Sequence, residues 1–265
     1  MRLSVIIPVY NEASTLRALL QRVVALPIDK EVLVVDDGSD EETVGQLQAA
    51  VADSLPGVVR IFTHRENRGK GAGIRTALEH ATGDVVIIQD ADLEYFPEDY
   101  VELLKVYQQN GAQAVYGVRD LTDRDFLMRF GNNLLTWLTN LLFGARLHDM
   151  ETCYKLVDRE LMQSLELRSH RFEIEAEISA KLLRRGVKIY EAPIRYDPRD
   201  EAAGKKLSPL DGLPTLATLV KYRLGLPEET PLRTVERGIV GGAIAAGLLA
   251  VALLWRAVTG PGDGS

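Results

Sequence analysis

Short runs of valine and isoleucine alternate with segments of helical periodicity through the first 118 residues of the chain. The apolar runs lack a polar face, which is typical of parallel strands buried on both sides. They are Leu3–Val9, Glu31–Asp36, Val58–Thr63, Asp84–Gln89 and Gln113–Val118. The helical segments between them are Ala13–Leu26, Asp40–Ser54, Lys70–His80 and Pro97–Gln109. This alternation predicts an α/β fold with a mostly parallel central sheet and helices on both faces.

The pattern changes after Gly117, where we place the start of a second half. The segment Phe126–Phe143 is apolar and aromatic and carries few charges. This composition suits an amphipathic helix at a membrane interface, and a helix packed into the core is the alternative. Glu173–Arg185 predicts an ordinary amphipathic helix that ends at Gly186, and Val187–Glu191 predicts one more strand.

The charge balance argues against a nucleic-acid binder. The formal net charge is −7 and the pI is about 5.3, whereas nucleic-acid binding usually needs a basic surface. The single cysteine, Cys153, cannot form an internal disulfide, so the fold does not depend on an oxidising compartment. A zinc site is not expected, because Cys153 and the histidines lack ligand spacing. The histidines are His64, His80, His148 and His170.

Both ends of the chain bear on membrane association. The N-terminus begins directly with a strand pattern, so we expect no signal peptide. Near the C-terminus the segment Gly238–Trp255 has no charge and is flanked by Arg233, Arg237 and Arg256. A spanning helix needs roughly 17 to 25 mostly apolar residues, so this segment predicts a membrane helix, with a buried or oligomer-forming Ala/Gly helix as the alternative. If the segment spans a bilayer, the arginines before it favour a cytoplasmic catalytic domain.

Polar residues follow two of the predicted strands at the edge where such sheets bind ligands. The first strand is followed by Tyr10-Asn11-Glu12 without a G-x-G-x-x-G pattern, which disfavours a dinucleotide-binding dehydrogenase. The second ends in Asp36-Asp37-Gly38-Ser39, where the carboxylates could hold the hydroxyls or base of a nucleotide. Turn and cap chemistry is the plainer interpretation of that motif.

The fourth strand ends in Asp90, Asp92 and Glu94, three carboxylates at alternate positions. If the strand continued, they would project toward the same side and repel one another. A divalent cation relieves such repulsion, and oxygen ligands of this kind suit Mg²⁺ or Mn²⁺ together with substrate phosphates. A solvated acidic turn is the alternative.

Several motifs in order resemble the family 2 glycosyltransferases of GT-A fold, and within them the dolichol-phosphate mannosyltransferase and polyprenyl-phosphate glycosyltransferase branch. Motifs in series are more specific than any one of them. The resemblance extends over about the first 225 residues. Its motifs are PVYNE (8–12), VDDGS (35–39), NRGKGAGIRTAL (67–78), ATGDVVIIQDAD (81–92), Gly117 to Arg119, DMETCYKLVDREL (149–161), HRFEIEAEISAKLLRRG (170–186), EAPIRYDPRDEAAGKKLSPLDG (191–212) and KYRL (221–224).

The resemblance implies roles for particular residues. Base and ribose would be held by Pro8, Tyr10, Glu12 and Asp37, and the expected substrate contacts also include Val35, Lys70 and Ala91. Asp90 and Asp92 would engage the metal and the diphosphate, with Glu94 as third ligand, although a glutamine is common at that position in the branch. The expected phosphate clamps are Arg119, Arg129, Arg199 and Lys205. The branch often has Gly-Lys-Ser-Lys where this chain has Gly204-Lys205-Lys206, so either lysine is a candidate.

The resemblance also implies an organisation and a reaction. We expect a GT-A domain over 1–225, divided into a nucleotide-sugar half (1–118) and an acceptor half (119–225), a linker (226–237), a transmembrane or membrane-associated helix (238–256) and a tail (257–265). The expected enzyme is an inverting, metal-assisted hexosyltransferase that uses GDP-mannose or another nucleotide diphosphate sugar. Mannose is favoured as the sugar and glucose comes next. The acceptor would be a polyprenyl or dolichyl phosphate, and the protein would be associated with the membrane.

Other functions stay open. A hydroxyl acceptor on a saccharide or small molecule would need a base, for which Asp149 is the candidate. A sugar nucleotidyltransferase is more remote, because it usually has a basic Gly-rich loop after the first strand. A non-catalytic membrane-associated binding module is the last alternative.

Overall fold

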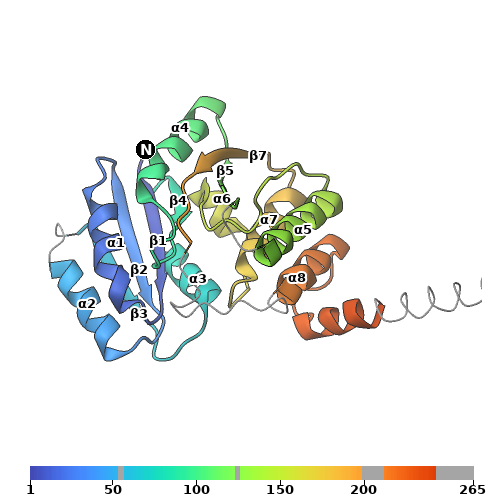
Figure 1. Cartoon of the computed structure of the whole chain (residues 1–265), viewed down its shortest axis with the longest axis horizontal. Helices are drawn as coiled ribbons and strands as arrows, with labels where there is room; N and C mark the ends of the chain where they lie inside the picture. Colours follow the sequence, from blue (N-terminus) through green and yellow to red (C-terminus); the bar gives the residue numbers. More distant parts are fainter. Residues whose placement is uncertain (53–56, 123–125, 199–211, 243–265) are drawn as a thin grey trace, which may run out of the picture.

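The computed structural model describes residues 1–52, 57–122, 126–198 and 212–242, in which the strands form a seven-stranded sheet (Figure 1). The strand order is β3-β2-β1-β4-β6-β5-β7. Strand β6 is antiparallel to both neighbours, and the other pairs are parallel. The strands are β1 (Leu3–Val9), β2 (Lys30–Asp36), β3 (Val59–Thr63), β4 (Val85–Ile88), β5 (Ala114–Arg119), β6 (Lys155–Asp158) and β7 (Ile189–Ile194).

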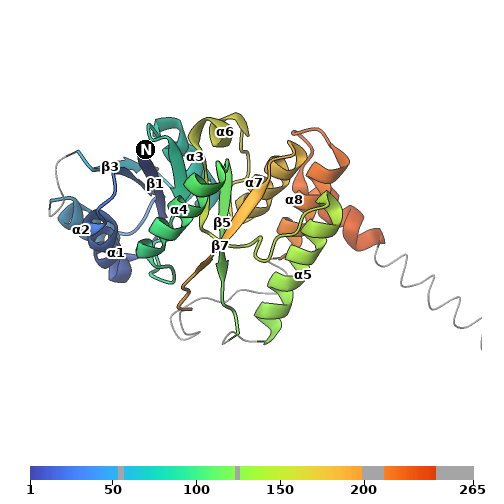
Figure 2. The same ribbon diagram turned by 90° about the horizontal axis from the view of Figure 1, so that it is seen from above.

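Helices cover both faces of this sheet (Figures 1 and 2). Helix α1 packs against α2, α3 packs on β1 and β2, and α4 packs on β5 and β7. Helices α5, α7 and α8 pack against one another on the side of the second half. The helices are α1 (Ala13–Ala25), α2 (Glu41–Ala52), α3 (Lys70–His80), the 3-10 helix η1 (Pro97–Asp99), α4 (Tyr100–Asn110), α5 (Phe126–Phe143), α6 (Arg159–Ser164), α7 (Ile174–Arg184) and α8 (Gly212–Leu224).

The predicted α/β architecture is confirmed, and the predicted elements of the first half match the observed ones within a few residues. The antiparallel strand β6 was not predicted, and neither were α6 and α8. Strand β6 spans only Lys155–Asp158 and includes a lysine and an aspartate, so its sequence lacks the apolar run that marks the other central strands.

The register of the sheet brings the polar strand ends together. Val9 pairs with Asp36, and Ile6 pairs with Ile88, so the residues that follow β1, β2 and β4 meet at one edge. Strand β4 is buried throughout, and β1 and β2 nearly so. Burying one large aliphatic side chain contributes about 1.5–3 kcal/mol to the stability of the fold. These buried strands therefore hold the residues at their ends in fixed positions.

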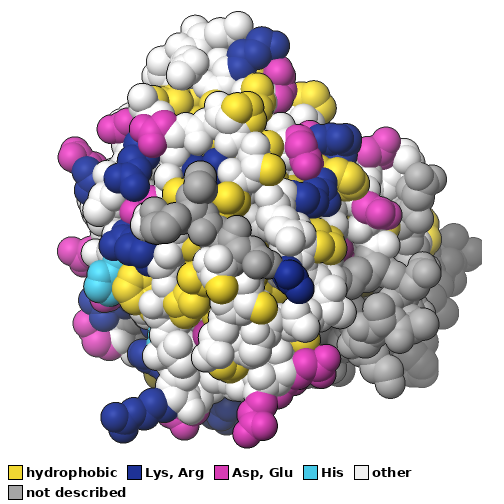
Figure 3. All heavy atoms as spheres, turned by 90° about the vertical axis from the view of Figure 1, so that its left-hand side faces the viewer, with side chains coloured by type: hydrophobic (Ala, Val, Ile, Leu, Met, Phe, Trp, Pro, Cys, Tyr) yellow, Lys and Arg dark blue, Asp and Glu magenta, His cyan; other side chains and the backbone are white. Residues whose placement is uncertain are grey.

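Helix α5 presents an apolar stripe to solvent. Its large side chains exposed by between 41% and 71% are Phe126, Phe130, Leu134, Trp137 and Leu141. Their spacing of three or four residues places them along one side of the helix. The face over α2 and α1 is different, because basic and acidic side chains are interspersed there (Figure 3).

The C-terminal segment is described only in part. Residues 232–242 are helical, so helix begins inside the predicted linker. The predicted membrane helix, 238–256, lies mainly outside the described residues. Within residues 1–52, 57–122, 126–198 and 212–242, no helix combines the length and apolarity that crossing a bilayer requires.

Candidate active site

Asp37 organises the segment that leads into α3. Its buried carboxylate lies 2.6 Å from His64 Nδ1 and accepts hydrogen bonds from the backbone N–H groups of Arg68 and Gly69. Gly38 follows at φ +74°, and a Cβ there would lie 2.8–2.9 Å from the backbone of Glu66 and Asn67. The turn after β2 is therefore packed against the loop before α3. The contact between Asp37 and a nucleotide stays a prediction.

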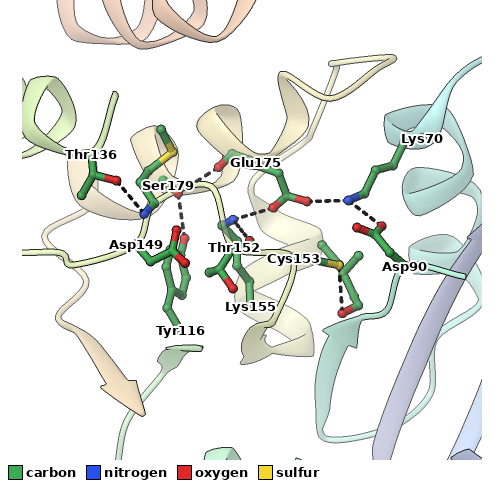
Figure 4. Close-up of polar contacts among 12 residues, drawn as sticks. Lys70, Asp90, Tyr116, Thr136, Asp149, Thr152, Cys153, Lys155, Glu175 and Ser179 are labelled. Atoms are coloured by element: carbon green, nitrogen blue, oxygen red, sulfur yellow. Dashed lines mark hydrogen bonds and ion pairs between the residues drawn. The ribbon is translucent and has the colours of Figure 1, made fainter. Parts of the chain in front are cut away.

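Lys70, the first residue of α3, lies between two carboxylates. Its Nζ is 2.7 Å from Asp90 Oδ1 and 3.0 Å from Glu175 Oε1 (Figure 4). Burial by itself would lower the pKa of Lys70, but nearby negative charge, above all that of Asp90, raises this pKa well above its usual value. The ammonium is therefore charged at any physiological pH.

The three acidic residues after β4 do not gather as predicted. Strand β4 ends at Ile88, and Leu93 has φ +61°, so the chain turns before Glu94. The buried Glu94 carboxylate accepts a hydrogen bond from the Tyr196 hydroxyl at 2.6 Å. No group of three His, Cys, Asp or Glu side chains among the described residues could hold a metal ion. The expectation that the three project together is wrong, because it assumed a strand that continues.

Asp90 and Asp92 still fit a divalent cation. Both are partly exposed at the carboxyl end of β4, and Asp92 also accepts the backbone N–H of Glu94 at 3.2 Å. Mg²⁺ is commonly held by one or two carboxylates together with substrate phosphates, so two carboxylates suffice. Glu94 Oε2 is engaged by the Tyr196 hydroxyl, and the role of Glu94 as third metal ligand stays a prediction.

Arg119 ends β5 and forms a paired contact with Asp149. Arg119 Nε donates to Asp149 Oδ2 at 2.7 Å, and Nη2 donates to Asp149 Oδ1 at 2.8 Å. The same Nη2 donates to Asn132 Oδ1 of α5 at 2.8 Å. The guanidinium is thus fixed between the end of β5 and helix α5. Since Asp149 is buried and holds Arg119 at both oxygens, the arrangement favours a positioning role for it over that of a base.

Sequence reasoning missed a second buried charge group, Lys155 with Glu175. Lys155 is fully buried, and its Nζ donates to Glu175 Oε2 at 2.5 Å and to the carbonyl oxygen of Thr152 (Figure 4). Burial raises the pKa of the nearby Glu151 to about 7, although the charge of Lys155 lowers it. The available signal was the occurrence of charged residues at positions that otherwise read as core, in METCYKLV and in IEAEI.

The other predicted substrate residues lie around this edge or outside the description. Tyr10 is exposed, and the Glu12 carboxylate accepts a bond from Thr15 Oγ1 at 3.1 Å at the start of α1. Arg129 donates from α5 to the Thr122 carbonyl at 3.4 Å. Pro8 is half-buried at the end of β1, whereas Val35 and Ala91 are buried. Arg199, Lys205 and Lys206 lie outside the described residues.

These placements describe a site in which each cationic side chain lies against a carboxylate. Lys70, Asp90 and Asp92 lie where parallel strands end, and Arg119 lies across from them at the end of β5. Held cations and carboxylates of this kind can bind a polyanion directly and through a metal ion.

Residues 4–165, more than half of the chain, match the family model described as Glycosyl transferase family 2. The chain belongs to this family. Strands β2 to β6, all of β1 except Leu3, and the carboxylates after β4 fall within the matched region.

Curated relatives extend the similarity over most of the chain. An undecaprenyl-phosphate 4-deoxy-4-formamido-L-arabinose transferase of Sodalis glossinidius is 28% identical over 248 residues, which cover 92% of this chain and 72% of the relative. The enzyme of the same name from Pseudomonas paraeruginosa is 31% identical over 252 residues, covering 93% and 70%.

Solved structures with similar folds include glucosyl-3-phosphoglycerate synthase from Mycobacterium tuberculosis. Its complex with uridine diphosphate has a TM-score of 0.65 at 21% identity and covers 86% of this chain and 82% of that chain. Its complex with Mn²⁺, UDP-glucose and phosphoglyceric acid has a TM-score of 0.64 at 20% identity, covering 86% and 81%. At this identity the likeness establishes the fold, so the expected GT-A-like α/β fold is confirmed.

Proposed function

We propose that this glycosyltransferase moves a sugar from a nucleotide diphosphate sugar to a polyprenyl phosphate at a membrane surface. The observation that carries the proposal is that α5 joins two features. Its Asn132 contacts Arg119 in the site, and its outer side bears the exposed apolar stripe. A site for an anionic headgroup therefore adjoins a surface suited to lipid.

The donor would bind at the ends of β1, β2 and β4. Asp90 and Asp92 would hold Mg²⁺ or Mn²⁺, which when bound stabilises the charge that develops on the leaving diphosphate. Lys70 lies beside Asp90 and would contact the same phosphates. The similarly folded mycobacterial synthase was solved with Mn²⁺ and UDP-glucose, which supports a metal ion and a nucleotide sugar as ligands of this fold.

The acceptor phosphate would approach Arg119. Because a phosphate oxygen is already anionic, no base is needed, and the protein's task is to align two polyanions that would otherwise repel. Arg119 is held by Asp149 and Asn132, so its guanidinium is presented without loss of side-chain freedom on binding. Attack from the face opposite the leaving group inverts the anomeric centre. The names of the curated relatives support a polyprenyl phosphate as acceptor.

The exposed stripe of α5 would lie in the membrane interface. Phe126, Phe130 and Trp137 belong to this stripe, and aromatic side chains are favoured at that depth of a bilayer. Between the two predictions for this helix, the stripe supports the interfacial one. The arginines at 233 and 237 still favour a cytoplasmic catalytic domain if the apolar segment after them spans the bilayer.

The sugar and the base are open to experiment. Mannose, then glucose, remains the expectation from sequence, whereas the curated relatives are named for a formamido-arabinose. A few hydrogen bonds in the pocket decide such specificity. The donor panel must therefore include GDP-mannose, UDP-glucose and a UDP-activated 4-formamido-arabinose.

The test is sugar transfer in detergent with each donor, undecaprenyl phosphate, and Mg²⁺ or Mn²⁺. We expect a glycosyl lipid from one donor, formed with wild-type protein and absent with EDTA or Asp92→Ala. Release of nucleotide without any lipid product, combined with transfer to a soluble sugar, would overturn the proposed acceptor.

Glu151 supports a second candidate, transfer to a hydroxyl. Its pKa of about 7 suits a general base, and its Oε1 has no hydrogen-bond partner in the part of the chain that the structure describes. For this reaction Glu151 is better suited than Asp149, whose two oxygens hold Arg119. Glu151→Gln would abolish transfer to a hydroxyl and would leave transfer to a lipid phosphate largely intact.

A further inference from the structure

Four charges of alternating sign run from the first half of the chain into the second. In order they are Asp90, Lys70, Glu175 and Lys155, separated by 2.7, 3.0 and 2.5 Å. They come from different elements, since Asp90 follows β4, Lys70 begins α3, Glu175 lies on α7 and Lys155 begins β6 (Figure 4). We call this series the charge row.

Stability alone does not account for the charge row. The side chains of Lys155, Glu175 and Lys70 are 0%, 5% and 10% exposed, so all three have lost most of their hydration. A buried ion pair is often no more stabilising than apolar side chains of the same size. The row is therefore better explained by the position in which it holds the ammonium of Lys70, beside Asp90.

The contacts of Glu175 restrict the position of the Lys70 ammonium. One of its oxygens faces Lys70 and the other accepts from Lys155, so the carboxylate cannot turn without breaking an ion pair. Lys155 is in turn fixed by the Thr152 carbonyl and lies 5.0 Å from the centre of the Tyr116 ring. A lysine side chain that is otherwise flexible is thereby directed at Asp90.

We propose that Glu175 is a positioning residue for the diphosphate of the donor, acting through Lys70. This inference rests on the proposed function. Lys70 Nζ lies within ion-pair distance of both Asp90 and Glu175, and an ammonium carries three N–H donors. A donor that is not directed at Asp90 suits a phosphate oxygen beside it, where the nucleotide diphosphate would lie. Glu175 itself does not touch the substrate.

The test measures nucleotide binding, which does not depend on the acceptor. UDP and GDP are first titrated into wild-type protein with Mn²⁺ by calorimetry, and the nucleotide that binds more tightly is compared with its monophosphate. In Glu175→Gln we expect affinity for the diphosphate to fall about tenfold, the value of one charge-assisted hydrogen bond. Affinity for the monophosphate, which lacks the second phosphate, should change little.

A double variant separates positioning from folding. Glu175→Gln alone leaves Lys155 buried with an uncompensated charge, which destabilises the protein. Glu175→Gln with Lys155→Met removes both charges, so the melting temperature should recover toward the wild-type value. We expect the ratio of diphosphate to monophosphate affinity to stay low in this variant. If the ratio recovers together with the melting temperature, Glu175 has only a structural role and the proposal is wrong.

Two further variants complete the design. Lys70→Met should lower the diphosphate affinity as much as Glu175→Gln does, and the two changes combined should lower it no further, because both act on one contact. Losses that simply add would contradict the proposal.

Glu31→Gln is the matched control, because Glu31 is equally buried and paired with Arg60 but lies near the start of β2, at the opposite edge of the sheet. It should lower the melting temperature without changing the ratio.

These outcomes also separate the inference from the proposed function. Wild-type protein that binds neither UDP nor GDP would overturn both. Suppose that wild-type protein binds a nucleotide diphosphate and glycosylates the lipid, and that Glu175→Gln leaves the ratio of diphosphate to monophosphate affinity unchanged. That result would overturn the positioning role alone.

Discussion

The two halves of the molecule differ in where their charged and large apolar side chains lie. In the first half, charged residues stand at the ends of apolar strands, as Asp90 and Asp92 do after β4. In the second half, charges such as Lys155 and Glu175 are buried, while large apolar side chains lie in solvent along α5. The first half also buries charged residues such as Glu31 and Asp37, but only the second half also exposes a row of large apolar side chains along one helix. Departures of this kind mark the surfaces that meet a ligand or a membrane.

The largest effect should come from the strand end of the first half. We expect Asp92→Ala to lower the rate of sugar transfer by at least about 100-fold, because one of two candidate metal ligands is lost. The measurement is glycosyl lipid formed per minute at saturating metal. Asp84→Ala, just before β4, is the control and should keep most of the activity. Equal rates for Asp92→Ala and wild type would contradict a metal site at this edge of the sheet.

The packing of the first half can be broken at a glycine. Gly38→Ala should destabilise the protein by about 2–3 kcal/mol, because φ is +74° and the new Cβ would meet the backbone of Glu66 and Asn67. Chemical denaturation measures this loss. Gly45→Ala on α2, where a Cβ would meet nothing within 4 Å, should instead stabilise by about 1 kcal/mol. A neutral Gly38→Ala would mean that the turn after β2 can move away from the α3 loop.

The buried charge of the second half should make stability depend on pH. The pKa of Glu151 is about 7 in the folded protein and near 4.5 when unfolded, so the folded state keeps a proton that the unfolded state loses. The stability from this proton is complete below pH 4.5 and is lost as pH rises through 7. The free energy of unfolding of Glu151→Gln should therefore exceed that of wild type by on the order of 2 kcal/mol at pH 8. Near pH 4 the two free energies should be equal. A difference that does not vary with pH would show that Glu151 is not the titrating group.

The exposed stripe of the second half should bind lipid. Phe130→Ser with Trp137→Ser should weaken partitioning onto vesicles of phosphatidylethanolamine and phosphatidylglycerol by about tenfold, since two interfacial side chains are lost. Cosedimentation measures the bound fraction. Val101→Ser on α4 removes an exposed apolar side chain elsewhere and should leave binding unchanged. Unchanged binding in the α5 variant would favour another protein surface as the partner of this helix.

The same contrast explains what the sequence could predict. Parallel strands and the helices between them were predicted because their periodicity is strong, and Leu3–Val9, Lys70–His80 and Phe126–Phe143 agree to the residue. Strand β6 was missed because a four-residue strand that begins with a lysine lacks periodicity. Its lysine is buried only because Glu175, twenty residues later, folds onto it. Local pattern carries no information on such a pairing.

The candidate site was predictable to the same extent. Asp90 and Asp92 follow a strand and Arg119 ends one, so their position at the ligand edge could be predicted from the strand pattern. The buried position of the Glu94 side chain could not be predicted from the sequence. It depends on the left-handed conformation of Leu93 and on the Tyr196 hydroxyl. The bidentate pair of Arg119 with Asp149 joins residues thirty positions apart and was equally hidden.

The insertion of β6 between β4 and β5 sets an order for folding. Strands β4 and β5 are consecutive in the chain but do not pair with each other, because β6 lies between them and pairs with both. During synthesis, β5 therefore has no neighbour in the sheet until residues 155–158 have left the ribosome. Helix α5 is made in that interval, with its apolar side chains already present. An early encounter of α5 with the membrane would protect the unfinished sheet from aggregation at the time when its edges are open.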